Sequence, residues 1–172
     1  MKLATYVGVD ALRVADEVEA VYREVFSAPP WNEKPAELDT FRPRFEENVS
    51  QTGFRLVAAV VDGEVRAFGA GWTTSPPFRR DRSYGVVFDE FGAVQVEREL
   101  VGAFEVDELA VHPESQGLGL GRAVLNSLSA GEPSWLLTAH RAVDTVAFYR
   151  RIGWRELRPQ VAEPRLAVFV SV

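Results

Sequence analysis

The sequence contains no cysteine, only two histidines and no long apolar run. Without cysteine the chain has no disulfide, no thiolate metal ligand and no cysteine nucleophile. His112 and His140 are separated and too few to indicate a metal centre. The N-terminal residues lack the apolar core of a signal peptide, and no later segment reaches the length of a membrane span. We therefore expect a soluble cytoplasmic protein with no metal.

Acidic residues outnumber basic ones, with 25 Asp and Glu against 19 Lys and Arg and a formal net charge of −6. This balance disfavours nucleic acid as a partner and is compatible with a cationic one. Apolar residues make up 47% of the chain, which is an ordinary globular composition. The length of 172 residues is typical of one domain, so we expect a single domain over residues 1–172.

Hydrophobic periodicity predicts helices and strands along the whole chain. Asp62-Gly63 is a strong hairpin signal between two strands. Asp10 is expected to cap a helix, and Pro43 is expected to kink or split another. The predicted strands cover residues 2–9, 54–61, 64–72, 106–111, 134–139, 154–157 and 165–172. The predicted helices cover 10–27, 38–51, 120–130 and 145–151, and a short helix of undefined limits lies within 86–100. This order indicates an α+β or α/β fold with a mixed sheet.

The stretch from Val106 to Arg122 reads as a strand, a glycine loop and the start of a helix. Pro113 ends the strand because it lacks a backbone donor. Gly117, Gly119 and Gly121 allow a tight turn and a close approach of the backbone to a ligand. A glycine loop at a helix N-terminus presents unpaired N–H groups and the positive end of the helix dipole. The stretch therefore predicts a phosphate site.

Two familiar phosphate loops do not fit this spacing. A dinucleotide loop, G-x-G-x-x-G, counted from Gly117, would need a glycine where Arg122 stands. The next predicted strand, residues 134–139, carries no acid for a ribose. A Walker loop would end in Gly-Lys-Ser/Thr, which is absent. A glycine-rich turn with no ligand is the remaining alternative.

The loop resembles the Q/R-x-x-G-x-G/A motif of the GNAT superfamily of N-acetyltransferases, with Gln116, Gly119 and Gly121 at the defining positions. Residues 148–154, F-Y-R-R-I-G-W, resemble the later F-Y-x-x-x-G-F element of that family. The order of predicted elements agrees with the family over nearly the whole chain. The resemblance implies the GNAT fold, an α+β (α/β-like) fold with a mixed, mostly antiparallel central sheet flanked by helices. In that fold a splayed strand pair holds acetyl-CoA.

The resemblance also implies which residues bind acetyl-CoA as co-substrate, with the loop amides on its pyrophosphate. The implied residues are Leu109, Ala110, Val111, Gln116, Gly117, Leu118, Gly119, Leu120, Gly121, Arg122 and Tyr149. The family often places Asn and Ala ahead of the Phe-Tyr pair, where this chain has Ala142 and Thr145. One side-chain contact to CoA is therefore missing here, which weakens the expected affinity.

Acetyl transfer to an amine requires a neutral amine and a proton for the leaving thiolate. Tyr149 matches the family's tyrosine that protonates the thiolate, and a purely packing role is its alternative. Glu105 is our first candidate for the base or water relay and Asp107 the second, because both fall where family members keep a catalytic group. Strand alternation places Glu105 and Asp107 on one face and Glu108 on the other. The alternative is that these acids bind the acceptor's ammonium.

The sequence thus predicts an N-acetyltransferase that moves an acetyl group from acetyl-CoA to a primary amine of a small molecule. Trp31 and Glu108 are expected to bind this acceptor, and residues 75–100 are expected to contribute to its recognition. A non-catalytic acyl-CoA-binding module and a protein N-terminal or lysine acetyltransferase are the alternatives. We expect no nucleic acid and no membrane as partners, and a homodimer is left open.

Overall fold

The computed structural model describes residues 1–129 and 131–171 and divides the chain into two compact units. Unit 1 comprises Met1–Trp72 and Asp107–Ala130, and unit 2 comprises Thr73–Val106 and Gly131–Val172. Strand β4, Phe104–Val111, contributes residues to both units. The predicted ends of a helix at Ala130 and of a strand at Val172 lie outside the described residues.

The strands of unit 1 form an antiparallel meander. Strand β1 (Lys2–Val7) pairs with β2 (Arg55–Val61), and β2 pairs with β3 (Glu64–Thr73). The turn between β2 and β3 is Asp62-Gly63, and both residues have positive φ, 52° and 86°. This backbone conformation is the one that a two-residue hairpin requires, which confirms the hairpin prediction.

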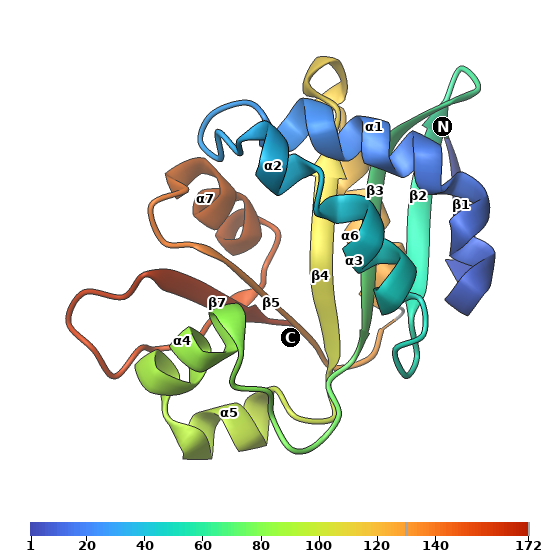
Figure 1. The fold of residues 1–172 in the computed structure, drawn as a ribbon. Helices are drawn as coiled ribbons and strands as arrows, with labels where there is room; N and C mark the ends of the chain where they lie inside the picture. Colours follow the sequence, from blue (N-terminus) through green and yellow to red (C-terminus); the bar gives the residue numbers. More distant parts are fainter. Residues whose placement is uncertain (130, 172) are drawn as a thin grey trace. The chain divides into compact units, whose positions relative to one another are not determined.

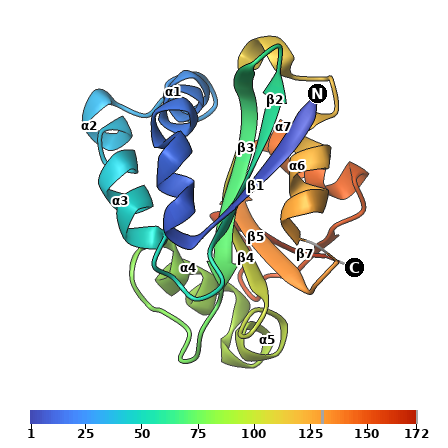
Figure 2. The same ribbon diagram turned by 90° about the vertical axis from the view of Figure 1, so that its right-hand side faces the viewer.

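Helices cover both faces of these strands (Figure 2), with α1 and α3 on one face and α6 on the other. The helical elements of unit 1 are the 3₁₀ helix Gly8–Val14, α1 (Ala15–Phe26), α2 (Pro35–Leu38), α3 (Phe41–Asn48), the 3₁₀ turn Pro113–Ser115 and α6 (Leu120–Ser129). Two predictions were wrong here. Asp10 lies inside the 3₁₀ helix, and the residue that precedes α1 is Val14. Pro43 lies in the first turn of α3, where proline is tolerated, so the break falls before Phe41 instead.

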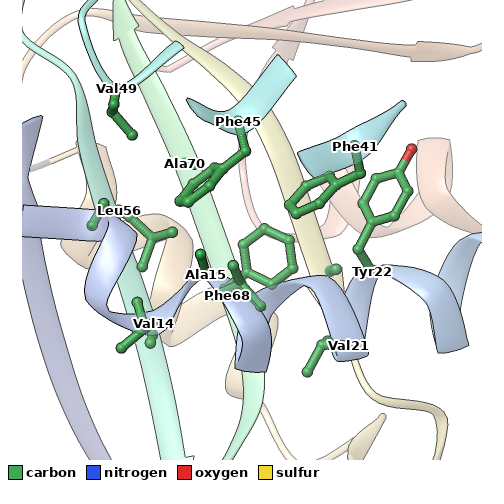
Figure 3. Packing of buried hydrophobic residues seen from close by; sticks show 14 of the residues in the cluster. Val14, Ala15, Val21, Tyr22, Phe41, Phe45, Val49, Leu56, Phe68 and Ala70 are labelled. Atoms are coloured by element: carbon green, nitrogen blue, oxygen red, sulfur yellow. The ribbon is translucent and has the colours of Figure 1, made fainter. Parts of the chain in front are cut away.

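The core of unit 1 is rich in aromatic rings (Figure 3), to which α1, α3 and β3 contribute. The rings of Tyr22 and Phe41 stack with centroids 4.3 Å apart, and Phe41 meets Phe68 edge to face at 6.1 Å. The apolar side chains that α2, α3 and the residue after α3 turn to the core are buried, namely Leu38, Phe41, Phe45 and Val49. This packing fixes α1 and α3 against the sheet and so positions their polar side chains.

Unit 2 contains the remaining strands. Strand β5 (Ser134–Ala139) pairs in parallel with β4 from Phe104↔Ser134 to Val106↔Leu136. Strand β7 (Leu166–Val170) is antiparallel to β5, and the short β6 (Arg155–Glu156) is antiparallel to β7. The helices of this unit are α4 (Arg82–Phe91), α5 (Ala93–Glu99) and α7 (Val143–Arg151), as labelled in Figure 1.

The hydrogen-bonded strand order is β1-β2-β3-β4-β5-β7-β6. Over the described residues the fold is therefore a mixed, mostly antiparallel sheet of seven strands flanked by helices, which confirms the predicted fold class. The splay of the central strands and the single-domain organisation stay predictions.

Candidate functional site

The glycine loop of unit 1 leaves open space beside its backbone. Gly117 and Gly119 have φ values of 77° and 81°, which lie in the left-handed region that glycine adopts without strain. A Cβ added at either residue would meet no atom within 4 Å. The Gln116 side chain holds the loop to the end of β4, because its Nε2 donates to the Val111 carbonyl at 3.3 Å. The loop is thus both tethered and accessible.

Helix α6 follows the loop, and the backbone N–H groups of its first turn lie beside the loop. The Ala123 N–H donates to the Gly119 carbonyl at 3.0 Å and makes the first hydrogen bond of the helix. The N–H groups of residues 120–122 precede that bond and have no carbonyl partner within the helix. Free amides and the positive end of the helix dipole together favour a bound phosphate.

Close packing fixes the position of α6. Its buried face includes Leu120, Val124 and Leu128, which recur at helical spacing. Gly69 of β3 permits the approach, since a Cβ there would lie only 3.0 Å from the Val124 Cγ1 atom. The Arg55 Nε atom donates to the Leu128 carbonyl at 2.6 Å. The amides of the glycine loop are therefore held by a rigid helix.

Three carboxylates of unit 1 are associated with one arginine. The Arg44 Nη2 atom lies 3.5 Å from the Glu108 Oε1 atom and 3.3 Å from the Tyr22 hydroxyl. The Tyr22 hydroxyl in turn donates to the Glu33 carboxylate at 2.9 Å. Asp107 also acts on Arg44 electrostatically. We call this group of five side chains the Arg44 cluster; it joins α1, α3, β4 and the segment after α1.

Burial raises the pKa of Glu108 well above its usual value, and the neighbouring charge of Asp107 raises it further, although Arg44 opposes both effects. Burial also raises the pKa of Tyr22, and the charge of Glu108 adds to this shift. Tyr22 therefore stays a neutral donor. Glu108 therefore keeps its proton to a higher pH than an exposed glutamate does.

Asp107 and Glu108 both line one narrow pocket of unit 1. The strand faces predicted for Glu105, Asp107 and Glu108 stay predictions. Aromatic side chains, among them Phe45 and Trp72, line the same pocket. Trp72 is buried and stacks on Phe54, so it belongs to the core. Trp31 and Glu108 were expected to bind the acceptor, and Glu108 is a member of the Arg44 cluster.

Trp31 lies in the segment between α1 and α2 and is half-buried. Its ring centroid is 5.5 Å from that of Phe26, whose own ring lies 4.4 Å from Tyr22. The ring of Phe26 thus lies between Trp31 and Tyr22, which is a member of the Arg44 cluster in the same unit. Its contact with an acceptor stays a prediction.

Glu105 lies in unit 2 and is only 4% exposed. Its carboxylate accepts a short hydrogen bond from the Tyr84 hydroxyl of α4 and one of 3.4 Å from the Thr74 hydroxyl. The Thr74 hydroxyl accepts at 2.7 Å from the Trp135 indole N–H. Glu105 thus faces a buried polar network, and its role as a base stays a prediction.

Tyr149 lies on α7 in unit 2 and is 6% exposed. Its ring packs against Phe148, Trp154 and Phe169, with centroids 5.2, 6.3 and 5.3 Å away. The packing role that the sequence left as an alternative is therefore real, and it is compatible with an acid role for the hydroxyl.

Sequence reasoning missed Arg44, Tyr22 and Tyr84. None of them lies in a motif, and each acquires its partner only through tertiary packing. A buried acid on β4 signals that a hydrogen-bond donor must exist, but the sequence does not say which one.

Residues 1–129 and 131–171 contain no group of three or more acidic or histidine side chains that could hold a metal ion. In those ranges no helix is long and apolar enough to cross a membrane.

Residues 80–156 match the acetyltransferase (GNAT) domain. The resemblance to the GNAT family is confirmed. The matched segment contains Glu105, the whole glycine loop and Tyr149. A GNAT domain supports acetyl transfer from acetyl-CoA in general, and with it an acyltransferase enzyme. No curated protein matches the sequence.

Solved structures of GNAT acetyltransferases share the fold. A GNAT-family acetyltransferase from Streptococcus agalactiae superposes with a TM-score of 0.68 at 10% identity, covering 99% of this chain and 95% of that chain. The PaiA N-acetyltransferase of Thermoplasma acidophilum, a complex with coenzyme A, gives 0.65 at 10% identity and 99% coverage of both chains. The ribosomal-protein-S18-alanine N-acetyltransferase of Escherichia coli gives 0.59 at 14% identity, covering 98% of this chain and 90% of that chain.

Proposed function

We propose that this chain transfers the acetyl group of acetyl-CoA to a primary amine of a small-molecule acceptor. The observation that carries the proposal is the open glycine loop at the N-terminus of α6, inside a segment that matches the GNAT domain. Its amides and helix dipole suit the pyrophosphate of CoA. No metal is required for this chemistry.

The proposed reaction is a direct attack. The amine nitrogen attacks the thioester carbon, the C–S bond then breaks, and the acetyl group stays on nitrogen. Tyr149 donates its hydroxyl proton to the leaving thiolate and is reprotonated from solvent. The proton lost by the amine passes to a carboxylate of β4, that of Glu105 or Asp107, directly or through a water molecule.

The Arg44 cluster supports a cationic acceptor. When Glu108 is ionised, Glu33, Asp107 and Glu108 together carry more negative charge than the Arg44 guanidinium neutralises. An ammonium group beside these carboxylates would relieve their mutual repulsion. We therefore place the acceptor's amine near Glu108, with Trp31 as an aromatic wall.

Gly119→Val tests the cofactor site. A branched side chain in the open space beside the loop amides should weaken CoA binding by roughly 10- to 100-fold, which corresponds to losing one or two charge-assisted hydrogen bonds. Gly102→Val is the matched control, since Gly102 has a φ of 82° against 81° at Gly119 and also has nothing near its Cβ. Calorimetric titration with CoA measures both. Equal affinity of the two folded variants would refute the assignment of the loop.

A panel of primary amines tests the transfer itself. Release of the CoA thiol from acetyl-CoA, followed with a thiol reagent, should depend on one class of small amine. CoA binding without thiol release for any amine or peptide would favour the binding module. Release with peptides alone would favour a protein acetyltransferase.

A further inference from the structure

Unit 2 contains an open groove within the region 75–100, where the sequence predicts acceptor recognition but contains no motif. The segment between β3 and α4 and the helices α4 and α5 line it, and its volume is about 780 Å³. Pockets that bind small organic molecules typically measure about 300–1,000 Å³. The groove is therefore of the right size for a small ligand.

The walls of the groove are mainly apolar. Phe78 and Val96 are buried beneath it, Phe88 is half-buried, and Val94 is 77% exposed. Phe78 is held in place because its ring packs against Tyr84 and Trp135, with centroids 5.6 and 6.0 Å away. An aromatic and aliphatic surface of this kind favours a ligand with an apolar body.

Arg80 supplies the charge of the groove. Its guanidinium carbon lies 3.4 Å from the centroid of the Phe88 ring. The loop is pressed against α4 at this point, because a Cβ on Gly85 would lie 2.7 Å from the Arg80 carbonyl oxygen. A guanidinium that stacks on a ring keeps the N–H groups at its edge free for an anion. Arg80 is thus held in place by its backbone and its side chain.

The other charged groups nearby are already paired or exposed. Arg79 pairs with Asp81 at 2.7 Å, and Arg98, which also lines the groove, pairs with Glu99 at 2.8 Å. Glu97 is the lining carboxylate and is exposed. In the part of the chain that the structure describes, no carboxylate pairs with Arg80. Arg80 is therefore a cation without an ion-pair partner among the described residues, beside an apolar surface.

We propose that this groove binds a small organic anion, with an apolar or aromatic body against Phe78, Phe88 and Val94 and one carboxylate, sulfonate or phosphate on Arg80. The proposal does not depend on acetyl transfer. A single anionic group satisfies the Arg80 guanidinium, and a bidentate contact fits its planar edge.

Two fluorescent dyes test the proposal on the full chain. Anilinonaphthalenesulfonate carries an aromatic body with a sulfonate, and phenylnaphthylamine carries the same aromatic body without it. Wild type should bind the sulfonate dye saturably. Arg80→Gln should weaken that dye by about 10-fold or more, the effect of one charge-assisted hydrogen bond, and should weaken the neutral dye by less than about twofold. An unchanged affinity for the sulfonate dye would overturn the proposal.

Val94→Glu locates the dye, since a carboxylate at this exposed position adds negative charge to the groove without touching the core. It should weaken the sulfonate dye by about 10-fold or more. Val143→Glu is the matched control, because Val143 is 70% exposed at the start of α7 and lies outside the groove lining. If Val143→Glu weakens binding as much as Val94→Glu, or if Val94→Glu has no effect, the dye lies elsewhere and the proposal is wrong.

Discussion

Glu108 is a side chain whose protonation depends on its neighbours. Burial and then Asp107 raise its pKa, while Arg44 opposes them and Glu33 adds to the rise. The native chain therefore holds this proton more tightly than the unfolded chain does. The resulting stability is fully present below the ordinary glutamate pKa, and it is lost as the pH rises through the raised value.

Glu108→Gln should remove this pH dependence. The free energy of unfolding of wild type should fall relative to that of the variant between about pH 4.5, near the ordinary glutamate pKa, and neutral pH. Urea unfolding across this range measures the difference. Glu17→Gln, at an exposed position of α1, should follow wild type. A constant difference between Glu108→Gln and wild type would contradict a raised pKa.

Tyr149 combines packing with a proposed chemical role. Tyr149→Phe removes only the hydroxyl and leaves the ring against Trp154 and Phe169. Because the proton acts mainly in the transition state, kcat should fall by roughly 10- to 1,000-fold with near-normal CoA affinity. Tyr6→Phe, on β1, is the control for losing a tyrosine hydroxyl. If kcat is unchanged while the thermal midpoint falls, Tyr149 only packs.

At the scale of elements, the region between β3 and β4 differs most from its sequence prediction. A single short helix of undefined limits was expected, and the structure has α4 and α5 separated at Gly92. The break falls at Gly92, whose φ of 79° is one that glycine adopts without strain. A single glycine among apolar residues is a weak signal for a helix end, so the sequence did not place the break. The Asp62-Gly63 hairpin, in contrast, is set by its own two residues and was predicted correctly.

Gly85 of α4 allows a test of how closely the helix packs against the backbone of the preceding segment. Glycine within a helix ordinarily costs about 0.5–1 kcal/mol relative to alanine, so Gly85→Ala would normally stabilise. Here the added Cβ would lie 2.7 Å from the Arg80 carbonyl, a backbone atom that cannot rotate away. We expect the variant to lose about 1–3 kcal/mol of unfolding free energy, as overpacked sites do. Thermal and urea unfolding measure this, with Ser83→Ala as the control in the same turn. A more stable Gly85→Ala would contradict the contact.

At the scale of the whole molecule, the sequence predicted the fold class because its strongest signals are local. The strand, glycine loop and helix around residues 106–122 are consecutive in the chain, and so is the element at 148–154. The partners of the acids are not consecutive. Glu105 meets Tyr84, and Glu108 meets Arg44, through contacts that only the folded units create.

Strand β4 has a consequence for how the length of this protein can change in evolution. Its first residues pair with β5, and its later ones belong to the other unit. One inserted or deleted residue within β4 would turn every following side chain to the opposite face. After such a change, the hydrogen bond between Tyr84 and Glu105 and the ion pair between Arg44 and Glu108 could not both be made. Insertions and deletions should therefore accumulate in the exposed segment around residue 162, and β4 should keep its length.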